Sequence, residues 1–197
     1  MRSKFIFLTL TLTVILFLPN ILPAQDQKLS VNVSYPIPIG DTFYSNYNGV
    51  VNTSFQYSRS IGSNFYVNGE FDYSNSELQL NNPFGENSIT HLNIFKLIAS
   101  VELPLKIENI LTFRPELGVG FAHLRFNNNE LNDQNTDNGF SGKFSLQVDR
   151  NISEKVSIGI SGSYNLILLG EPDVGVDTPY NKELHSVNIG IVTMYHF

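Results

Sequence analysis

The sequence predicts an all-β fold, an eight-stranded antiparallel up-and-down barrel that crosses a membrane with its strands. Eight segments alternate between apolar and polar residues, and the connections between them alternate between short and long. The last segment keeps this alternation to the final residue, the aromatic Phe197. Short turns at one end of a barrel and longer loops at the other are typical of barrels in bacterial outer membranes.

The first four predicted strands each have one apolar parity and one largely polar parity, which is the period of a strand with two unlike faces. The fourth is the least regular, because Ile94 and Ile98 share a face with Lys96. The four segments cover 29–35, 51–58, 65–74 and 94–103, and their apolar faces carry Leu29, Val31, Val33 and Tyr35, then Val51, Thr53, Phe55 and Tyr57, then Phe65, Val67, Phe71 and Tyr73, and then Phe95, Leu97, Ala99, Val101 and Leu103.

The last four predicted strands follow the same rule. Pro115 lies inside one of them and has no N–H to donate to a ladder, so we expect a bulge or a weak point there. Gly118 and Gly120 in the same strand are expected to ease the curvature of the barrel. The segments cover 111–122, 140–149, 156–166 and 186–197, and their apolar faces carry Leu111, Phe113, Leu117, Val119 and Phe121, then Phe140, Phe144, Leu146 and Val148, then Val156, Ile158, Ile160, Tyr164 and Leu166, and then Val187, Ile189, Ile191, Thr193, Tyr195 and Phe197.

The connections predict which end of the barrel faces outward. An even number of strands puts both termini on the short-turn side, which is the periplasmic side in outer-membrane barrels, and leaves the longer loops extracellular. The long connections are rich in Asn, Asp, Gly and Pro, which favour turns. The short connections are 59–64, 104–109 and 150–155, and the long ones are 36–48, 75–90, 127–138 and 168–183.

Two long connections are candidates for an extracellular binding surface. The segment 127–138 is nearly all Asn, Asp, Gln and Glu; it is either a solvated mobile loop or a site for a divalent cation or a glycan. The segment 75–90 carries Leu78, Leu80 and Phe84, which could extend the strands above the membrane or meet a partner.

The N-terminus has the pattern of a secretory signal. Arg2 and Lys4 precede an apolar run over 5–18, and small Ala24 offers a cleavage site. An uncleaved membrane anchor is the alternative, although the run is short and rich in Thr for a spanning helix. We therefore expect a signal peptide over 1–24, cleavage near Ala24, a barrel domain over 25–197, and residence in the outer membrane of a Gram-negative bacterium.

Composition narrows the classes of partner. The chain of 197 residues carries a formal net charge of −6, which argues against nucleic acid because phosphates demand a basic face. It has no Cys, so there is no disulfide and no lipid-anchored cysteine. No cofactor is expected, and no His or Cys spacing indicates a metal site.

The direction of the apolar face decides between two kinds of barrel. A soluble lipocalin-like barrel places that face inward, whereas a membrane barrel places it against lipid. The polar parity here is rich in small polar residues rather than in Lys and Glu, which favours the membrane barrel with outer-membrane lipid as its surroundings. Aromatic residues near the strand ends predict two interfacial girdles: Tyr35, Tyr73, Phe121, Phe140 and Tyr164 near the long loops, and Tyr57, Phe65, Phe113, Tyr195 and Phe197 near the short turns.

At three places the chain resembles the small outer-membrane β-barrel family that includes OmpX and the OmpA barrel domain. The resemblant segments are 113–122, 152–159 and the terminal strand 186–197. The resemblance implies an eight-stranded membrane barrel, usually without catalysis. It also implies that Tyr195 and Phe197 belong to the terminal signal that the barrel assembly machinery recognises.

The polar parity of the strands predicts the contents of the lumen. Eight strands leave an interior just wide enough for side chains to fill it, and charges in so narrow a space should pair. We expect an ion-pair network that is either a structural plug or a gate in a narrow channel, formed by Glu70, Asp72, Lys96, Glu102, Arg114, Glu116, Lys143 and Asp149.

The sequence gives little support for catalysis. His185 and Ser186 are adjacent on one strand and point to opposite faces, so they cannot act as base and nucleophile. His91 and His123 lie near the long-loop end and could face a loop acid, and His196 is the remaining histidine. The leading interpretation is a non-enzymatic barrel with a structural, adhesive or binding role through its outer loops. The alternatives are a narrow channel for small solutes, an outer-membrane lipid-modifying enzyme and a soluble lipocalin-like binder.

Overall fold

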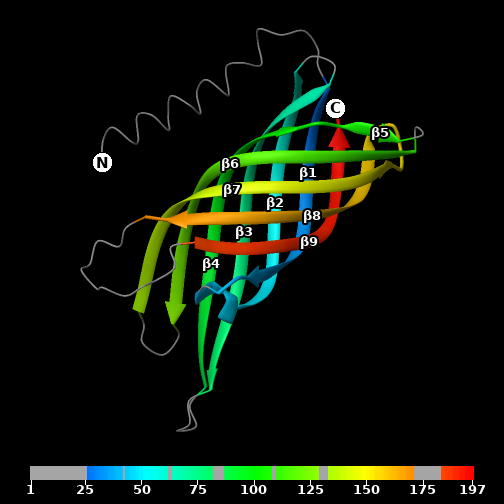
Figure 1. Ribbon diagram of the computed structural model, residues 1–197. Coiled ribbons are helices and arrows are strands. Elements are labelled where there is room, and N and C mark those ends of the chain that lie inside the picture. The colour runs from blue at the N-terminus through cyan, green and yellow to red at the C-terminus, as the bar shows by residue number, and fades with distance from the viewer. Residues whose placement is uncertain are drawn as a thin grey trace.

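Figure 1 shows the computed structural model, which describes residues 26–41, 43–61, 64–81, 87–107, 110–128, 133–170 and 183–197. The expected signal peptide over 1–24 and its cleavage near Ala24 lie outside the described residues, as does Phe84. No helix in the described part of the chain is long and apolar enough to cross a membrane.

Eight long antiparallel strands form one closed barrel in up-and-down order, which confirms the predicted fold class (Figure 1). Each strand pairs with the next along the chain except β4, which pairs with β6 past the short strand β5, and β1 pairs with β9. The strands are β1 (Gln27–Ile39), β2 (Asn48–Ile61), β3 (Phe65–Asn81), β4 (Asn87–Glu102), β5 (Leu105–Ile107), β6 (Leu111–Asn128), β7 (Asp133–Asn151), β8 (Val156–Leu169) and β9 (Glu183–His196), and the 3₁₀-helix η2 (Phe43–Asn46) lies between β1 and β2.

The two ends of the barrel differ. The N–H of Phe197 donates to the carbonyl of Gln27, so the start of β1 and the end of the chain lie side by side. We call this end, which also holds β5 and the β7–β8 turn, the terminal end. The opposite end, called the loop end, carries η2 and the β3–β4 and β6–β7 hairpins, and Figure 1 shows the β3–β4 hairpin reaching farthest from the C-terminus.

The prediction of long loops over 75–90 and 127–138 is wrong. β3 and β4 pair in register from Tyr66 opposite Glu102 to Asn81 opposite Asn87, and β6 and β7 pair as far as Asn128 opposite Asp133. Most residues of these two segments are therefore strand. In these extensions the outward side chains are polar, whereas apolar residues such as Leu78 and Phe126 lie on the inward parity. The pattern of the apolar band is therefore reversed, and the predicted strands stopped short of the true strand ends.

Exposure along the strands alternates with the apolar residues outside. Val119 is 70% exposed on the outer wall, whereas Glu102 is 2% exposed in the lumen. A soluble barrel would show the opposite arrangement, because water solvates polar atoms and not apolar ones. Because the barrel is closed, its wall presents no open sheet edge to lipid.

The register places the edge of this apolar wall at the loop end. Tyr73 lies opposite Phe95, which lies opposite His123, and the rings are 5.1 and 6.4 Å apart between centroids. The next outward row is polar, because Asn75 lies opposite Asn93. On β3 the apolar band therefore runs from Phe65 to Tyr73, close to the roughly 9–11 residues that a tilted strand needs to cross a bilayer.

Pro115 interrupts a ladder without bulging its strand. β6 pairs with β7 in unbroken register through Pro115 opposite Leu146. On its other side β4 ends at Glu102 and β5 resumes at Leu105, with Leu103 and Pro104 between them. The N–H of Leu103 still donates to the carbonyl of Pro115, at 3.0 Å, but Pro115 has no N–H to return the bond. The expected weak point is thus a strand break rather than a bulge.

Candidate functional site

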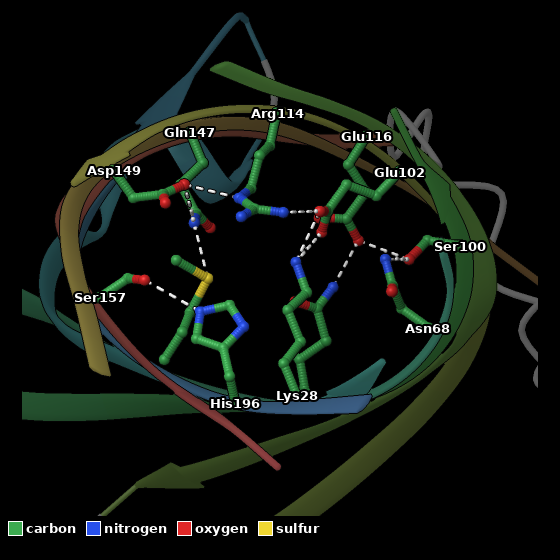
Figure 2. Close-up of polar contacts among 12 residues, drawn as sticks. Lys28, Asn68, Ser100, Glu102, Arg114, Glu116, Gln147, Asp149, Ser157 and His196 are labelled. Carbon is green, nitrogen blue, oxygen red and sulfur yellow. Dashed lines mark hydrogen bonds and ion pairs between the residues drawn. The ribbon is translucent and has the colours of Figure 1, made fainter. Parts of the chain in front are cut away.

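The lumen at the terminal end holds an ion-pair cluster, called here the terminal lumen cluster. Arg114 on β6 lies between two carboxylates: its Nη1 is 2.8 Å from Glu102 Oε1 and its Nε is 2.6 Å from Asp149 Oδ1. Lys28 on β1 donates to both oxygens of Glu102 from across the barrel, at 2.5 and 2.7 Å. Figure 2 shows the four side chains pointing from different strands toward the centre of the barrel. They are Lys28, Glu102, Arg114 and Asp149.

Lys28 is a member of this cluster that the sequence reasoning missed. Its side chain is 1% exposed, and its Nζ lies 4.8 Å from the centre of the Tyr66 ring. The signal was present, because Lys28 continues the inward parity of Ser30, but the predicted strand began one residue later. With Lys28 included, the described lumen residues supply five carboxylates and four cations: Glu70, Asp72, Glu102, Glu116 and Asp149, and Lys28, Lys96, Arg114 and Lys143.

A second cluster, the middle lumen cluster, lies farther along the barrel. Lys143 forms an ion pair with Glu70 and lies 3.6 Å from Glu116. Glu116 also accepts hydrogen bonds from Gln56 and Ser145, both at 2.9 Å. Each charge in this cluster therefore has a partner of opposite sign or a polar donor, as burial of a charge requires.

The last predicted charges, Asp72 and Lys96, form a buried pair nearest the loop end. Lys96 Nζ lies 3.0 Å from Asp72 Oδ1 and donates to Asn165 at 3.1 Å. Asn52 donates to the same Asp72 oxygen at 2.9 Å. The structure thus brings all eight predicted lumen residues together with partners, in three successive groups along the barrel.

Ion pairs cross the described lumen at each of these groups. A cavity of about 20 Å³ lies beside Lys143, Glu116 and Gln56, which is room for about one water molecule. A solute would have to displace paired charges to pass this point. A structural plug requires these contacts to persist, whereas a gate requires the same groups to move, and the choice between the two stays a prediction.

Above the charged groups the lumen becomes apolar, which the sequence reasoning did not anticipate. We call this layer the mouth cluster; around it pack the half-buried Leu78, Phe126 and Leu169. The segment around η2 delivers two tyrosines into it, and Tyr44 is 2% exposed. Burial raises the pKa of the Tyr44 phenol. The mouth cluster consists of Tyr44, Tyr47, Leu92, Ile94, Ala122, Leu124, Ile167 and Leu184.

The histidines at the loop end do not form a catalytic centre with a nucleophile among the described residues. His91 Nδ1 lies 3.4 Å from Glu77 Oε1, so an acid does face it, and His123 Nδ1 lies 2.9 Å from Asn138 Oδ1. His185 contacts the Tyr164 hydroxyl at 2.6 Å, while Ser186 is buried on the other face of the strand.

A serine and a histidine do meet at the terminal end. His196 Nε2 lies 2.9 Å from Ser157 Oγ, as Figure 2 shows. Ser157 is completely buried and its hydroxyl donates to Asn151 at 2.6 Å, so a substrate cannot reach it as a nucleophile. Among the described residues no group of three or more His, Cys, Asp or Glu is placed to hold a metal ion.

The predicted assembly residues lie on the outer wall at the terminal end. The rings of Tyr195 and Phe197 meet edge to face with centroids 5.2 Å apart, and Phe197 is 66% exposed. Phe197 is also fixed through its backbone to β1. Both rings are accessible in the terminal girdle, and their role as an assembly signal stays a prediction.

The comparisons identify the fold. Neither a protein-family model nor a curated protein sequence matches the chain. Among solved structures, a major outer membrane protein from Thermus thermophilus matches with a TM-score of 0.59 and 12% identity over 87% of this chain and 99% of the other.

Two further solved structures agree. Ail, the attachment invasion locus protein of Yersinia pestis in complex with the heparin analogue sucrose octasulfate, gives a TM-score of 0.57 at 12% identity over 88% of this chain and 99% of Ail. Neisserial surface protein A gives 0.54 at 12% identity over 88% of this chain and 96% of that protein. With its apolar outer wall, its paired polar lumen and these neighbours, the chain has the fold of the small outer-membrane β-barrels.

Proposed function

We propose that the protein is a non-enzymatic, non-conducting barrel of the outer membrane that displays a polar β-sheet outside the cell as a binding surface. The observation that carries this proposal is the length of β3, β4, β6 and β7, which have 17, 16, 18 and 19 residues. A bilayer needs about 9–11 residues per strand, so each of these strands continues well beyond the apolar band.

The extensions form one sheet. β3 pairs with β4, β4 with β6 and β6 with β7 through the polar rows above Tyr73. With the termini at the periplasmic side, the loop end and this sheet are extracellular. We call its outward side the outer polar face. Its described members are Asn75, Glu77, His91, Asn93, Arg125, Asn127, Thr136 and Asn138.

The outer polar face supports binding of a neutral, hydrogen-bonding ligand rather than a polyanion. Amides dominate it, and they are already ordered: Asn75 donates to Asn93 at 2.9 Å, and Arg125 donates to Asn127 at 3.1 Å. Among the described members of this face, Arg125 is the single permanent cation. Ail was solved with a sulfated sugar analogue, but one arginine would give a sulfated ligand little electrostatic attraction. A neutral glycan fits the amide-rich face better.

Shortening the two hairpins in register tests this role. Tyr73 and Phe95 face each other, as do Phe121 and Phe140, so each pair can be joined by a two-residue Asn-Gly turn, which removes every described member of the outer polar face. Cells displaying the full chain should attach to surfaces coated with a neutral glycan, and the shortened chain should not. The shortened chain must still show the heat-dependent gel shift of a folded barrel. Equal attachment by both chains, or attachment to sulfated glycans alone, would overturn the proposal.

A further inference from the structure

The mouth cluster is a cup: side chains of the barrel strands form its wall, and two tyrosines from the connection between β1 and β2 occupy its interior. Leu92 on β4, Leu124 on β6 and Leu184 on β9 point inward and are at most 1% exposed. Tyr44 and Tyr47 enter from the connection between β1 and β2, with ring centroids 6.3 Å apart and tilted by 40°. The cup is therefore apolar because of the barrel wall, and the two rings from this connection fill it.

The floor of the cup is polar. The Tyr44 hydroxyl lies 3.4 Å from the Ser76 hydroxyl, at the long limit of a hydrogen bond. Below it lies the buried Asp72–Lys96 pair. An apolar wall with a hydroxyl partner at its base is complementary to an aromatic ring that carries one hydroxyl group, which is the chemistry of the Tyr44 side chain itself.

The segment that fills the cup is short. η2 has four residues, and a single short turn of 3₁₀-helix has little stability alone. A backbone bond runs from the Tyr47 N–H to the Tyr44 carbonyl at 3.0 Å. Gly40, with φ of 91°, provides a turn before it that other residues rarely adopt. Burial of the two rings contributes to holding η2 in place.

Closure of the lumen does not depend on these rings. The three charged groups below the cup already cross the described lumen with ion pairs, and the cavity beside Lys143 has room for about one water. Tyr44 thus fills a separate apolar chamber at the loop end of the lumen. A ligand that fills the same chamber could replace it, in proportion to its differential affinity for the open state.

We propose that the mouth cluster is a binding site for a small phenolic ligand, which Tyr44 fills in the ligand-free protein and leaves when the ligand binds. This site is inside the barrel mouth and is independent of the outer polar face. Removal of the Tyr44 ring should leave a chamber that accepts p-cresol, the free form of the tyrosine side chain. The wild-type protein should bind p-cresol about tenfold or more weakly than Tyr44→Ala, because η2 must first leave the cup.

The test uses the full-length mature chain in micelles, with p-cresol as the probe and toluene as its analogue without a hydroxyl. Tyr44→Ala should show a saturable thermal shift with p-cresol and a several-fold weaker response to toluene. The matched control is Tyr35→Ala, which removes a 52% exposed tyrosine from the outer wall and reports partition of the probe into detergent. Absence of saturable binding by a folded Tyr44→Ala protein would overturn the proposal.

A second measurement does not require the Tyr44→Ala protein to fold. The chain has no Cys, so Ser45→Cys at an exposed position of η2 gives a single labelling site in the protein. A nitroxide there should become more mobile as p-cresol is added, with a saturable dependence on its concentration. If the label stays immobile at p-cresol concentrations well above those that stabilise Tyr44→Ala, p-cresol does not displace Tyr44 and Tyr47 from the cup, and the proposal fails.

Discussion

Removal of Arg114 should destabilise the barrel far more than removal of an arginine on its outer face. Arg114 is 7% exposed and joins Glu102 to Asp149. In Arg114→Ala, Glu102 would still form its ion pair with Lys28. Asp149, by contrast, would lose its ion pair and retain a longer hydrogen bond from Gln147, at 3.2 Å. Asp149 Oδ2 has no hydrogen-bond partner within the described structure even in the wild type. Asp149 would therefore become a buried charge with little compensation, a situation that costs about 3–5 kcal/mol.

The matched control is Arg125→Ala. Arg125 is exposed at the loop end, and its described side-chain bond goes to Asn127 at 3.1 Å. An exposed substitution of this kind changes stability by about 0.5 kcal/mol or less. Both variants would be unfolded by urea in phospholipid vesicles and followed by the heat-dependent gel shift. Equal midpoints for Arg114→Ala and Arg125→Ala would refute the claim that the lumen network stabilises the barrel.

A double variant distinguishes the loss of the attraction between Arg114 and Asp149 from the cost of leaving the Asp149 carboxylate buried without a partner. If the cost of Arg114→Ala arises because Asp149 is left unpaired, then Asp149→Ala in the same chain should recover part of it. The loss in Arg114→Ala/Asp149→Ala should then be smaller than the sum of the two single losses, with a coupling of about 0.5–3 kcal/mol. Strict additivity would show that the two side chains act independently, against the 2.6 Å contact between them.

Three other predictions follow from particular contacts. Gly120→Ala should fold poorly because the new Cβ would overlap the carbonyl oxygen of Leu97. Gly142→Ala should fold normally because nothing lies within 4 Å of its Cβ, and equal folding yields of the two variants would contradict the close approach of β6 to β4. Amides of β5 should exchange with solvent faster than those of β4 from Lys96 to Glu102, because the ladder is broken opposite Pro115; uniform protection measured by hydrogen exchange would argue against the break. Burial raises the pKa of the Tyr44 phenol, so the stability that this group contributes is present below about pH 10, the usual pKa of tyrosine, and is lost as pH rises through its pKa in the folded protein. Tyr44→Phe, which has no phenol to ionise, should therefore lose less thermal stability between about pH 9 and 12 than the wild type. Parallel curves of melting temperature against pH for the two proteins would show that the phenol is not buried.

The barrel could be predicted from the sequence because lipid contact imposes apolar residues on one parity of every strand. Val33, Phe55, Leu117 and Ile160 are all more than half exposed on the outer wall, and such residues produce the alternation. The rule fails where the strands leave the apolar band. Around Glu77 and His91 the outward residues are polar and the apolar ones, such as Leu92, point inward, so the alternation is reversed although the ladder continues.

The lumen was predictable as a set of inward residues but not as pairs. Lys28 and Glu102 are 74 residues apart, and their contact depends on the stagger of strands around the closed barrel. The mouth cluster was missed for a related reason. Leu92 and Leu124 are apolar residues on the inward, mostly polar parity, and the structure explains them because the tyrosines near η2 pack against them. The position of η2 follows from tertiary packing rather than from its own sequence.

Single-channel recording of the refolded mature chain in planar bilayers tests most directly the central claim that the barrel is closed by its own side chains. Folding would be verified by the heat-dependent gel shift. The paired charges from Lys28 to Lys96 and the small residual cavity lead us to expect a folded protein with no conductance steps. Discrete, reproducible steps from the folded wild-type protein would contradict this account and would make the lumen charges determinants of ion selectivity.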